Sequence, residues 1–321
     1  MITVVIPTIG RATLLDTLAA VGSAMPVIVV DDRTEAAGGV LASLPGRVRV
    51  VRSFGRGPAA ARNVGWRAAE TPWVVFLDDD VIPAPGWAEA VWKDLVDLPD
   101  DVAGSQGRIE VPLPSSRRPT DGERHTGGLS GALWVTADMA YRRPVLESAG
   151  GFDERFPRAY REDADLALRV RRAGHRLVRG RRLTTHPVRD DGFWASVRFQ
   201  RGNADDALMR RLHGPGWRAA IGGGPGRLRL HAATTTAALA ATALGASALR
   251  EAPGGARPRW AAQAAGAAAL AWGALTAEFA WRRIAPGPRT PAEVLRMVVT
   301  SVVIPPVACA HRLRGEWRAR R

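Results

Sequence analysis

Four short apolar segments, separated in part by helix-like segments, dominate the first quarter of this 321-residue chain. They are rich in Val and Ile and are bounded by Pro, Gly or acidic residues, which is typical of strands. Near-continuous apolar strands that alternate with helices predict a parallel sheet buried by helices, that is, an α/β domain. The expected strands are Ile2–Ile6, Val27–Val30, Val48–Val51 and Trp73–Leu77, and the expected helices are Thr13–Val21 and Ala59–Ala69.

Acidic residues directly follow two of these strands. Asp31 and Asp32 follow the second strand, and Asp78, Asp79 and Asp80 follow the fourth. Ligands of open α/β sheets bind beyond the carboxyl ends of the strands, so all five carboxylates are expected at the ligand-binding edge. Three adjacent carboxylates repel one another, and an Asp-x-Asp pair can relieve this by holding a divalent cation, with Mg²⁺ or Mn²⁺ suiting the ligands. A solvated turn explains the same residues if they are taken alone.

Two further segments carry polar residues of the same chemistry. Gly55–Gly65 leads into a helix with Arg62 and Asn63 in its first turns, where helix N-termini and Arg favour phosphate. His186 follows an expected strand and could complete a metal site, contact phosphate or be structural. Simple helix capping and packing explain the glycine-rich segment equally well.

A third acidic group opens a later helix. Glu162, Asp163 and Asp165 lie where the helix dipole favours negative charge, which is the structural interpretation. The functional interpretation is a general base, because a carboxylate within hydrogen-bonding reach can take the proton from an attacking sugar hydroxyl.

Taken together and in this order, the motifs resemble the family 2 glycosyltransferases, inverting enzymes of the GT-A fold. The resemblance covers roughly residues 1–190. It lies in the segments VVIPTIGR, VIVVDDR, GPAAARNVGW, WVVFLDDDV, GGFDERF and REDADLALRVRRAG.

The resemblance implies a role for each matching residue. Asp31 and Asp32 would contact the base or ribose of the nucleotide, and Arg62 and Asn63 would lie in the helix on the nucleotide side. Asp78, Asp79 and Asp80 would form the Asp-x-Asp element, with Asp78 and Asp80 as metal ligands beside His186. Asp163 would be the catalytic base, and Glu162 would position the acceptor or the base.

The implied activity is metal-dependent transfer of a sugar from a nucleotide-diphosphate-sugar donor to a glycan or lipid-linked acceptor of the cell envelope. A nucleotidyltransferase that makes sugar-nucleotides is the alternative, although Ile6–Arg11 is a poor match to the phosphate loop it would need. The net charge of +14 favours anionic partners, but the Arg residues are scattered without interleaved aromatic residues. A basic nucleic-acid-binding protein is therefore only a second alternative, and we expect no nucleic-acid partner.

The composition changes after about residue 215, so the expected domains are a GT-A catalytic domain over 1–215 and an Ala- and Arg-rich helical region over 216–321. The apolar runs Ala232–Leu249 and Trp260–Trp281 are long enough to cross a hydrocarbon core, and Met297–Ala310 is a third run that Pro305-Pro306 would break. These helices predict attachment to the cytoplasmic face of the cell membrane, with a helical dimer interface as the alternative. Cys309 is the single cysteine, so no intramolecular disulfide is possible, and the N-terminus does not resemble a signal peptide.

Between these regions the sequence predicts a polar loop followed by mixed elements. The expected loop covers residues 108–128, the expected strands are Leu133–Val135 and Arg176–Val178, and the expected helices are Pro144–Ala149, Glu162–Ala173 and Gly192–Leu212.

Overall fold

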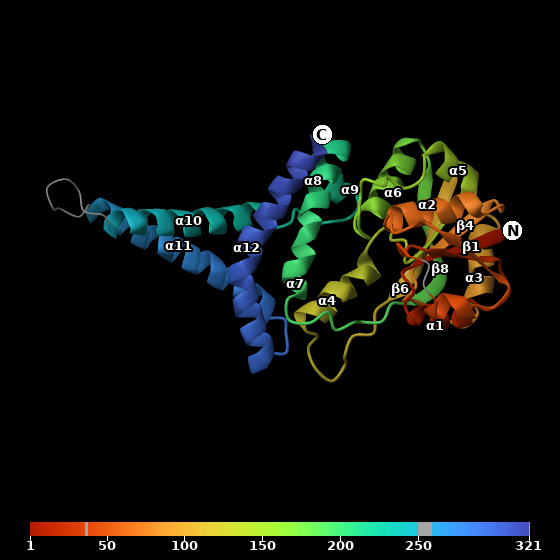
Figure 1. The fold of residues 1–321 in the computed structure, drawn as a ribbon, viewed down its shortest axis with the longest axis horizontal. Helices are drawn as coiled ribbons and strands as arrows, with labels where there is room; N and C mark the ends of the chain where they lie inside the picture. Colours follow the sequence, from red (N-terminus) through yellow and green to blue (C-terminus); the bar gives the residue numbers. More distant parts are fainter. Residues whose placement is uncertain (36–37, 250–258, 321) are drawn as a thin grey trace. The chain divides into compact units, whose positions relative to one another are not determined.

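The computed structural model describes residues 1–35, 38–249 and 259–320, which divide into two compact units (Figure 1). We call them the sheet unit and the helical unit and describe each by itself. The sheet unit comprises Met1–Leu113, His125–Arg189 and His213–Gly223, and the helical unit comprises Pro114–Arg124, Asp190–Leu212 and Gly224–Arg321. The chain leaves the sheet unit for the last time after Gly223, whereas the sequence placed the boundary between the two domains at about residue 215. Two earlier segments also belong to the helical unit.

The sheet unit is built on an eight-stranded sheet with the order β3-β2-β1-β4-β7-β6-β8-β5. The pairs β1–β2, β2–β3, β1–β4 and β6–β8 are parallel, whereas β7 is antiparallel to both β4 and β6, and β5 is antiparallel to β8. The strands are β1 (Ile2–Thr8), β2 (Val27–Asp31), β3 (Val48–Arg52), β4 (Trp73–Leu77), β5 (Ile82–Pro83), β6 (Val102–Glu110), β7 (Asp138–Arg142) and β8 (Arg176–Thr185).

The predicted parallel arrangement holds for the first four strands and does not extend beyond β4. The strands β1 to β4 of the sheet are parallel, and β1, β2 and β4 are buried along almost their whole length. The inversion comes from β7, whose sequence DMAYR lacks the continuous apolar character of the first strands. The segment Leu133–Val135, expected as a strand, lies in the connection that precedes β7.

Helices cover both faces of the sheet and close two apolar clusters. One cluster joins α1 and α3 to one face, and the other joins α2, α5 and α6 to the opposite face. Helix α2 lies very close to the sheet, because a Cβ at Gly65 would come within 2.3 Å of a methyl group of Val5. The helices of this layer are α1 (Thr13–Val21), α2 (Pro58–Ala68), α3 (Trp87–Leu95), α5 (Arg143–Ser148) and α6 (Glu162–Arg172), with the short helix η1 (Gly39–Ser43) beside them.

The region expected as one polar loop, residues 108–128, is partly ordered into regular elements. Strand β6 continues to Glu110, and α4 (Asp121–Gly127) and η2 (Gly128–Gly131) follow. Strand β8 is also longer than predicted and irregular, because one residue of β6 faces three of β8 between the pairs Gln106–Arg179 and Arg108–Leu183. This bulge turns the buried Arg182 inward, where its Nε donates to Asp138 at 2.7 Å.

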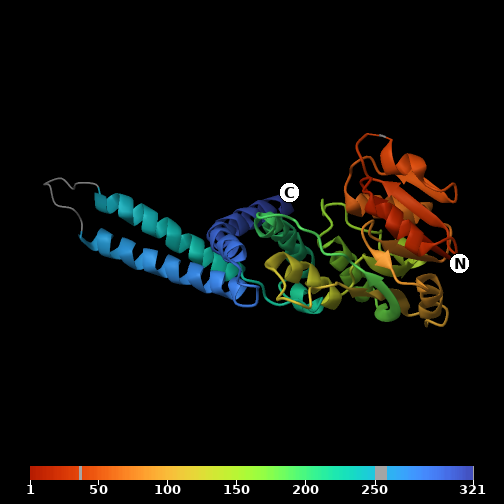
Figure 2. The ribbon, with the colours of Figure 1, turned by 90° about the horizontal axis from the view of Figure 1, so that it is seen from below.

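The helical unit contains a hairpin formed by α10 (Leu228–Leu249) and α11 (Arg259–Ile284), which lie side by side in both views (Figure 1 and Figure 2). Helix α12 continues through Pro305 and Pro306, so the expectation of a break there is wrong. By length and composition α10 and α12 could each cross a membrane. The elements of this region are α7 (Ala195–Arg198), η3 (Phe199–Arg201), α8 (Gly202–His213), α10 (Leu228–Leu249), α11 (Arg259–Ile284) and α12 (Pro291–Ala319), and α9 (Trp217–Ala220) belongs to the sheet unit.

Candidate active site

The carboxyl ends of six strands meet at one edge of the sheet, because β1, β2, β3, β4, β6 and β8 run in the same direction. This edge is where an open α/β sheet binds ligands. It gathers the polar residues Thr8, Asp31, Ser53, Asp78, Asp79, Asp80, Glu110 and His186.

Arg62 connects the triple Asp (Asp78–Asp80) to the acidic residues at the start of α6. Its Nη2 donates to Oδ1 of Asp78 at 2.9 Å, and its Nη1 donates to Oε1 of Glu162 at 2.7 Å. The guanidinium comes from α2 and is only 2% exposed. A single buried cation thus brings together two of the motifs that the sequence suggested separately.

Asp79 and Asp80 are buried, yet both are oriented by polar neighbours. Thr8 Oγ1 donates to Asp79 Oδ2 at 2.5 Å, and Arg11 Nη1 donates to Asp79 Oδ1 at 2.9 Å. Arg189 forms an ion pair with Asp80. Asp79 and Asp80 are therefore held by cations and a hydroxyl group and do not project into bulk solvent.

Asp80 and His186 are the side chains best placed to hold a metal ion. His186 Nε2 lies 3.9 Å from Asp80 Oδ1, and its Nδ1 lies 3.0 Å from the carbonyl oxygen of Pro187. With Nδ1–H donating to that carbonyl, the lone pair of Nε2 is free for a cation. Burial and the negative charge of Asp78 raise the pKa of Asp80, while Arg189 and His186 oppose the rise.

The carboxylates of this donor set fit Mg²⁺ or Mn²⁺, which are bound mainly by oxygen ligands. Within the described residues, no group of three or more His, Cys, Asp or Glu side chains is already arranged around a metal position. The protein would therefore supply part of a coordination shell, with the remaining positions open to ligand oxygens.

The acidic pair at the start of α6 has unusual proton affinity. Burial and the neighbouring Asp163 raise the pKa of Glu162 to about 8, against the opposing charge of Arg62. Burial also raises the pKa of Asp163, although the N–H of Ala164, which donates at 2.7 Å, and nearby Arg residues oppose this. A carboxylate with raised proton affinity is suited to accept a proton from a hydroxyl group.

The two acids after β2 have different surroundings. Asp31 is buried and accepts from Arg33 Nε at 2.8 Å; burial opposes its ionisation, but the bonds from Arg33 and the charge of Arg52 hold its pKa below the ordinary value. Asp32 accepts from Ser53 Oγ at 2.7 Å and from the N–H of Gly57 at 3.0 Å. Asp31 therefore orients Arg33, while Asp32 anchors the turn that leads into α2.

Asn63 lies beside Arg62 on α2, but its side chain is engaged entirely within the protein. Its Nδ2 donates to Phe152 O and to Glu154, and its Oδ1 accepts from the N–H of Phe152 and from the indole of Trp66. These four bonds fill its capacity, so we interpret Asn63 as a brace between α2 and the segment that precedes α6.

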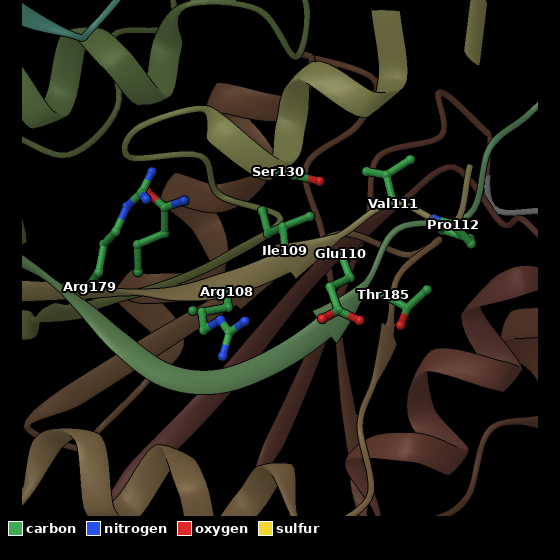
Figure 3. Close-up of a pocket in the computed structure, with 10 residues that line it drawn as sticks. Arg108, Ile109, Glu110, Val111, Pro112, Ser130, Arg179 and Thr185 are labelled. Carbon is green, nitrogen blue, oxygen red and sulfur yellow. The ribbon is translucent and has the colours of Figure 1, made fainter. Parts of the chain in front are cut away.

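A cavity of about 440 Å³ lies where β6 and β8 diverge. In Figure 3, Arg108 and Glu110 project to one side of β6, while Ile109 projects to the other. Thr185, which precedes His186, also lines the cavity, so this space adjoins the carboxyl edge.

Sequence reasoning missed three residues of the site, namely Thr8, Arg11 and Arg189. Thr8 and Arg11 lie in the segment VVIPTIGR, and position after a strand was the available signal for both. Arg189 carried no such signal among the many Arg residues of the chain, and it becomes distinguishable only through its contact with Asp80.

The fold and this edge define an α/β, GT-A-like domain followed by long C-terminal helices. Residues 3–148 match the family described as Glycosyl transferase family 2. This part of the sheet unit therefore matches the family 2 glycosyltransferase domain that the sequence motifs predicted.

Two curated relatives share part of their length with the chain. The chain is 34% identical over 194 residues to the pre-mycofactocin glycosyltransferase of Mycobacterium tuberculosis. This match covers 55% of the chain and 40% of the relative. It is 38% identical over 103 residues to the validoxylamine A glucosyltransferase of Streptomyces hygroscopicus subsp. jinggangensis, which covers 28% of this chain and 24% of the relative. The chain thus spans less than half the length of either relative.

The fold is also similar to solved structures at low sequence identity. A structure of GalNAc-T7 with UDP, GalNAc and Mn²⁺ gives a TM-score of 0.47 at 17% identity over 66% of this chain and 51% of that chain. A structure of S. aureus TarS gives a TM-score of 0.43 at 14% identity over 94% of this chain and 54% of that chain.

Proposed function

We propose that the protein transfers a sugar from a nucleotide-diphosphate-sugar donor to a hydroxyl group of a glycan or lipid-linked acceptor. The observation that carries this proposal is the bridge made by Arg62 between Asp78 and Glu162. It joins an acidic element suited to a cation-bound diphosphate with an acidic pair suited to a proton acceptor. A transferase needs both functions at one reacting centre.

On the donor side, the residues after β2 and β3 would bind the nucleoside, with Asp32 accepting from a ribose hydroxyl or a base N–H. Arg11 and Arg189 lie against Asp79 and Asp80, and their guanidinium groups would form charge-assisted hydrogen bonds with the diphosphate. Both side chains are substantially exposed, so they can turn from carboxylate to phosphate.

Asp80, His186 and Asp78 would hold Mg²⁺ or Mn²⁺. When bound, the ion would supply positive charge that stabilises the leaving diphosphate. Asp78 and Asp80 follow β4 and His186 follows β8, two strands of one sheet, which supports this assignment.

Asp163 would act as the base on the acceptor side. As the acceptor oxygen attacks C1 of the sugar, the bond from C1 to the phosphate oxygen breaks and the diphosphate leaves with that electron pair. The hydroxyl proton passes to a carboxylate oxygen of Asp163, and the configuration at C1 is inverted. Glu162 is almost fully buried and bonded to Arg62, so we assign it the role of holding Arg62 in place.

The cavity between β6 and β8 would take the acceptor, because it adjoins His186 and combines hydrogen-bonding with apolar walls. Arg108 and Glu110 would bind acceptor hydroxyl groups. Ile109 would pack against a less polar face of the same molecule.

The helical unit would attach the enzyme to the cytoplasmic face of the cell membrane. Trp260 and Trp281 are 66% and 59% exposed on α11. They are separated by about 31 Å at about 1.5 Å per residue, which matches the roughly 30 Å of a hydrocarbon core. Exposed Trp residues at both ends of a helical segment, with Arg residues just outside, are typical of membrane interfaces, although among the described helices only α10 and α12 are long and apolar enough to cross a membrane.

The proposal is tested with purified protein and a panel of nucleotide-sugars, by thermal shift with and without Mn²⁺. We expect one donor class to stabilise the protein with Mn²⁺ present, by about 2.7 kcal/mol at a hundredfold excess over Kd. Asp80→Ala should lose this response, and Asp16→Ala, which removes an exposed acid on α1, should keep it.

The products distinguish the proposal from its alternative. Release of nucleoside diphosphate supports transfer, whereas pyrophosphate chemistry would identify a nucleotidyltransferase. Stabilisation that is equal in wild type and Asp80→Ala would exclude the metal site.

A further inference from the structure

A cavity of about 370 Å³ lies in the helical unit along α11, and none of the described side chains that line it is charged. We call it the α11 groove. On α11 its lining runs from Trp272 to Ile284, and Val298 of α12 also contributes. At about 1.5 Å per residue this part of α11 is about 18 Å long, close to the roughly 15 Å of one leaflet of a hydrocarbon core. The groove therefore has the length and the apolar lining that an extended alkyl chain needs.

Two arginines converge at one end of this groove. Arg118 Nη1 donates to the carbonyl oxygen of Ala285 at 3.1 Å, and Arg289 Nη2 donates to the same oxygen at 3.3 Å. Ala285 directly follows Ile284, which lines the groove. The two guanidinium groups therefore lie together where the apolar lining stops.

Neither of these arginines has a carboxylate partner among the described residues. Asp121, three residues after Arg118, pairs instead with Arg283, and Glu278 of α11 pairs with two other arginines. The carbonyl end of a helix offers only about half a negative charge, against the two positive charges of Arg118 and Arg289. Positive charge thus remains at this end of the groove, and guanidinium groups bind phosphate strongly.

Arg289 is held in this position by its surroundings. Its φ is 56°, in the left-handed region that non-glycine residues seldom occupy. Its guanidinium lies over the ring of Trp281, with 5.4 Å from Cζ to the ring centre, and Trp281 lines the α11 groove. The contact between these two side chains therefore joins the cationic end to the apolar groove.

We propose that this part of the helical unit binds one molecule of an anionic phospholipid. Its phosphate would accept hydrogen bonds from Arg118 and Arg289, and one acyl chain would lie in the α11 groove. Trp281 would lie at the level between headgroups and hydrocarbon, where Trp residues are enriched. Basic residues at the cytoplasmic face bind anionic lipids. The site rests on the membrane attachment proposed above and shares no residue with the proposed donor and acceptor sites.

The test uses the full-length protein in an uncharged detergent and follows lipid retention by native mass spectrometry. The probes are phosphatidylglycerol, phosphatidylcholine and glycerol 3-phosphate. We expect saturable retention of one phosphatidylglycerol. Phosphatidylcholine should bind at least roughly tenfold more weakly, because its choline cation opposes the two arginines. Glycerol 3-phosphate, which has the phosphate without the chains, should not displace the lipid at equal concentration.

The cationic end is tested by a double variant. Arg118→Gln with Arg289→Gln should weaken binding of phosphatidylglycerol at least roughly tenfold, because the charge-assisted hydrogen bonds are lost. The matched control is Arg314→Gln with Arg318→Gln, which removes two exposed arginines of α12 and changes the net charge equally. This control should bind the lipid as the wild type does.

The groove is tested separately by filling it. Ala277 is an exposed lining residue, and Ala277→Phe should occupy the space of the acyl chain and weaken binding of phosphatidylglycerol at least roughly tenfold. Ala274→Phe adds the same ring at an exposed position of α11 that does not line the groove, so it should bind the lipid as the wild type does.

Four results would overturn the inference. The wild type could retain no lipid saturably, or it could retain phosphatidylglycerol and phosphatidylcholine equally. Complete displacement by glycerol 3-phosphate would show an anion site without chain recognition, and wild-type affinity in the double arginine variant would remove both arginines from the site. The wild-type comparisons stand on their own should a variant fail to fold.

Failure of this site and failure of the proposed function give different results. Lipid retention is measured without donor or acceptor, so a failed transferase assay leaves the lipid site standing. Membrane attachment is measured independently by carbonate extraction of membranes. A protein that stays in the membrane fraction but shows no preference for phosphatidylglycerol would lose this site alone.

Discussion

The two units place polar and apolar side chains in opposite ways. In the sheet unit the interior is apolar, and its buried charges, such as Arg62 and Arg182, are paired with carboxylates. In α10 the buried residues are His231 and Thr234, while Leu239 is 66% exposed. The sheet unit buries its apolar side chains, whereas the hairpin leaves many of them exposed, which supports the membrane attachment proposed above.

This contrast explains why each unit was recognisable by a different signal. Motifs of charged residues at strand ends identified the sheet unit, since charge in a water-soluble fold is placed where it acts. Length and apolar composition identified the long C-terminal helices, and a helix that contacts lipid would need no amphipathic periodicity. The predictions below test first the paired charges and then the exposed apolar residues.

The largest expected effect is on the chemistry of the sheet unit. Asp163→Asn should keep donor binding and lower kcat by about 10²- to 10⁴-fold, because an amide cannot take the proton of the acceptor. Turnover and donor Kd are measured in parallel. Asp153→Asn, which changes a half-buried acid paired with Arg155 before the same helix, is the control and should retain turnover. Normal turnover by Asp163→Asn would remove Asp163 as the base.

Arg62→Gln should destabilise the sheet unit by about 3–5 kcal/mol, because it leaves buried carboxylates without their counter-charge. The measurement is the free energy of unfolding from urea denaturation. Arg67→Gln changes an exposed arginine one helical turn away and should cost less than about 0.5 kcal/mol. Equal stability of the two variants would show that Arg62 is not the link between the triple Asp and α6.

The exposed apolar residues of the helical unit are tested by adding charge. Leu270→Lys places a cation near the middle of α11, at a side chain that is 77% exposed. In lipid this costs about 2.5–3.5 kcal/mol, whereas in water a surface change costs about 0.5 kcal/mol or less. We therefore expect a larger fraction of Leu270→Lys in the soluble phase after carbonate extraction of membranes.

Leu313→Lys is the matched control, because Leu313 is 71% exposed but lies between Arg312 and Arg314 on α12. It should remain with the membrane fraction to the same degree as wild type. If both variants behave alike and the wild type is soluble without detergent, the hairpin instead forms an interface between copies of the chain.

The sequence allowed the first four strands, helices α1 and α2 and the acids of the site to be predicted, because each rests on local pattern. The link through Arg62 could not be predicted, since it joins residues 16 and 100 positions away along the chain. The antiparallel β7 and the bulge in β8 depend on tertiary pairing, and β7 carries polar residues at both ends. Helix α12 shows the reverse error, in which the local rule for proline was overridden by its surroundings.

The last prediction concerns the pH dependence of stability in the sheet unit. Burial and Asp163 raise the pKa of Glu162 from 4.5 to about 8. Between these values the folded state binds more protons than the unfolded state, so the free energy of unfolding falls as pH rises, by up to about 1.4 kcal/mol per pH unit. Glu162→Gln removes this titration and keeps an oxygen that can accept a hydrogen bond from Arg62. The free energy of unfolding of this variant should therefore fall less steeply with pH than that of the wild type.

The pKa of Asp163 is raised as well, so part of the pH dependence of stability should remain in the Glu162→Gln variant. The measurement is urea denaturation of the metal-free protein at several pH values between about 5 and about 8. Glu89→Gln, at an exposed acid in the first turn of α3, should follow the wild type. If the free energy of unfolding falls with pH equally in Glu162→Gln and wild type, Glu162 is ionised throughout this range. The charge of Arg62 would then lower the pKa of Glu162 more than burial raises it.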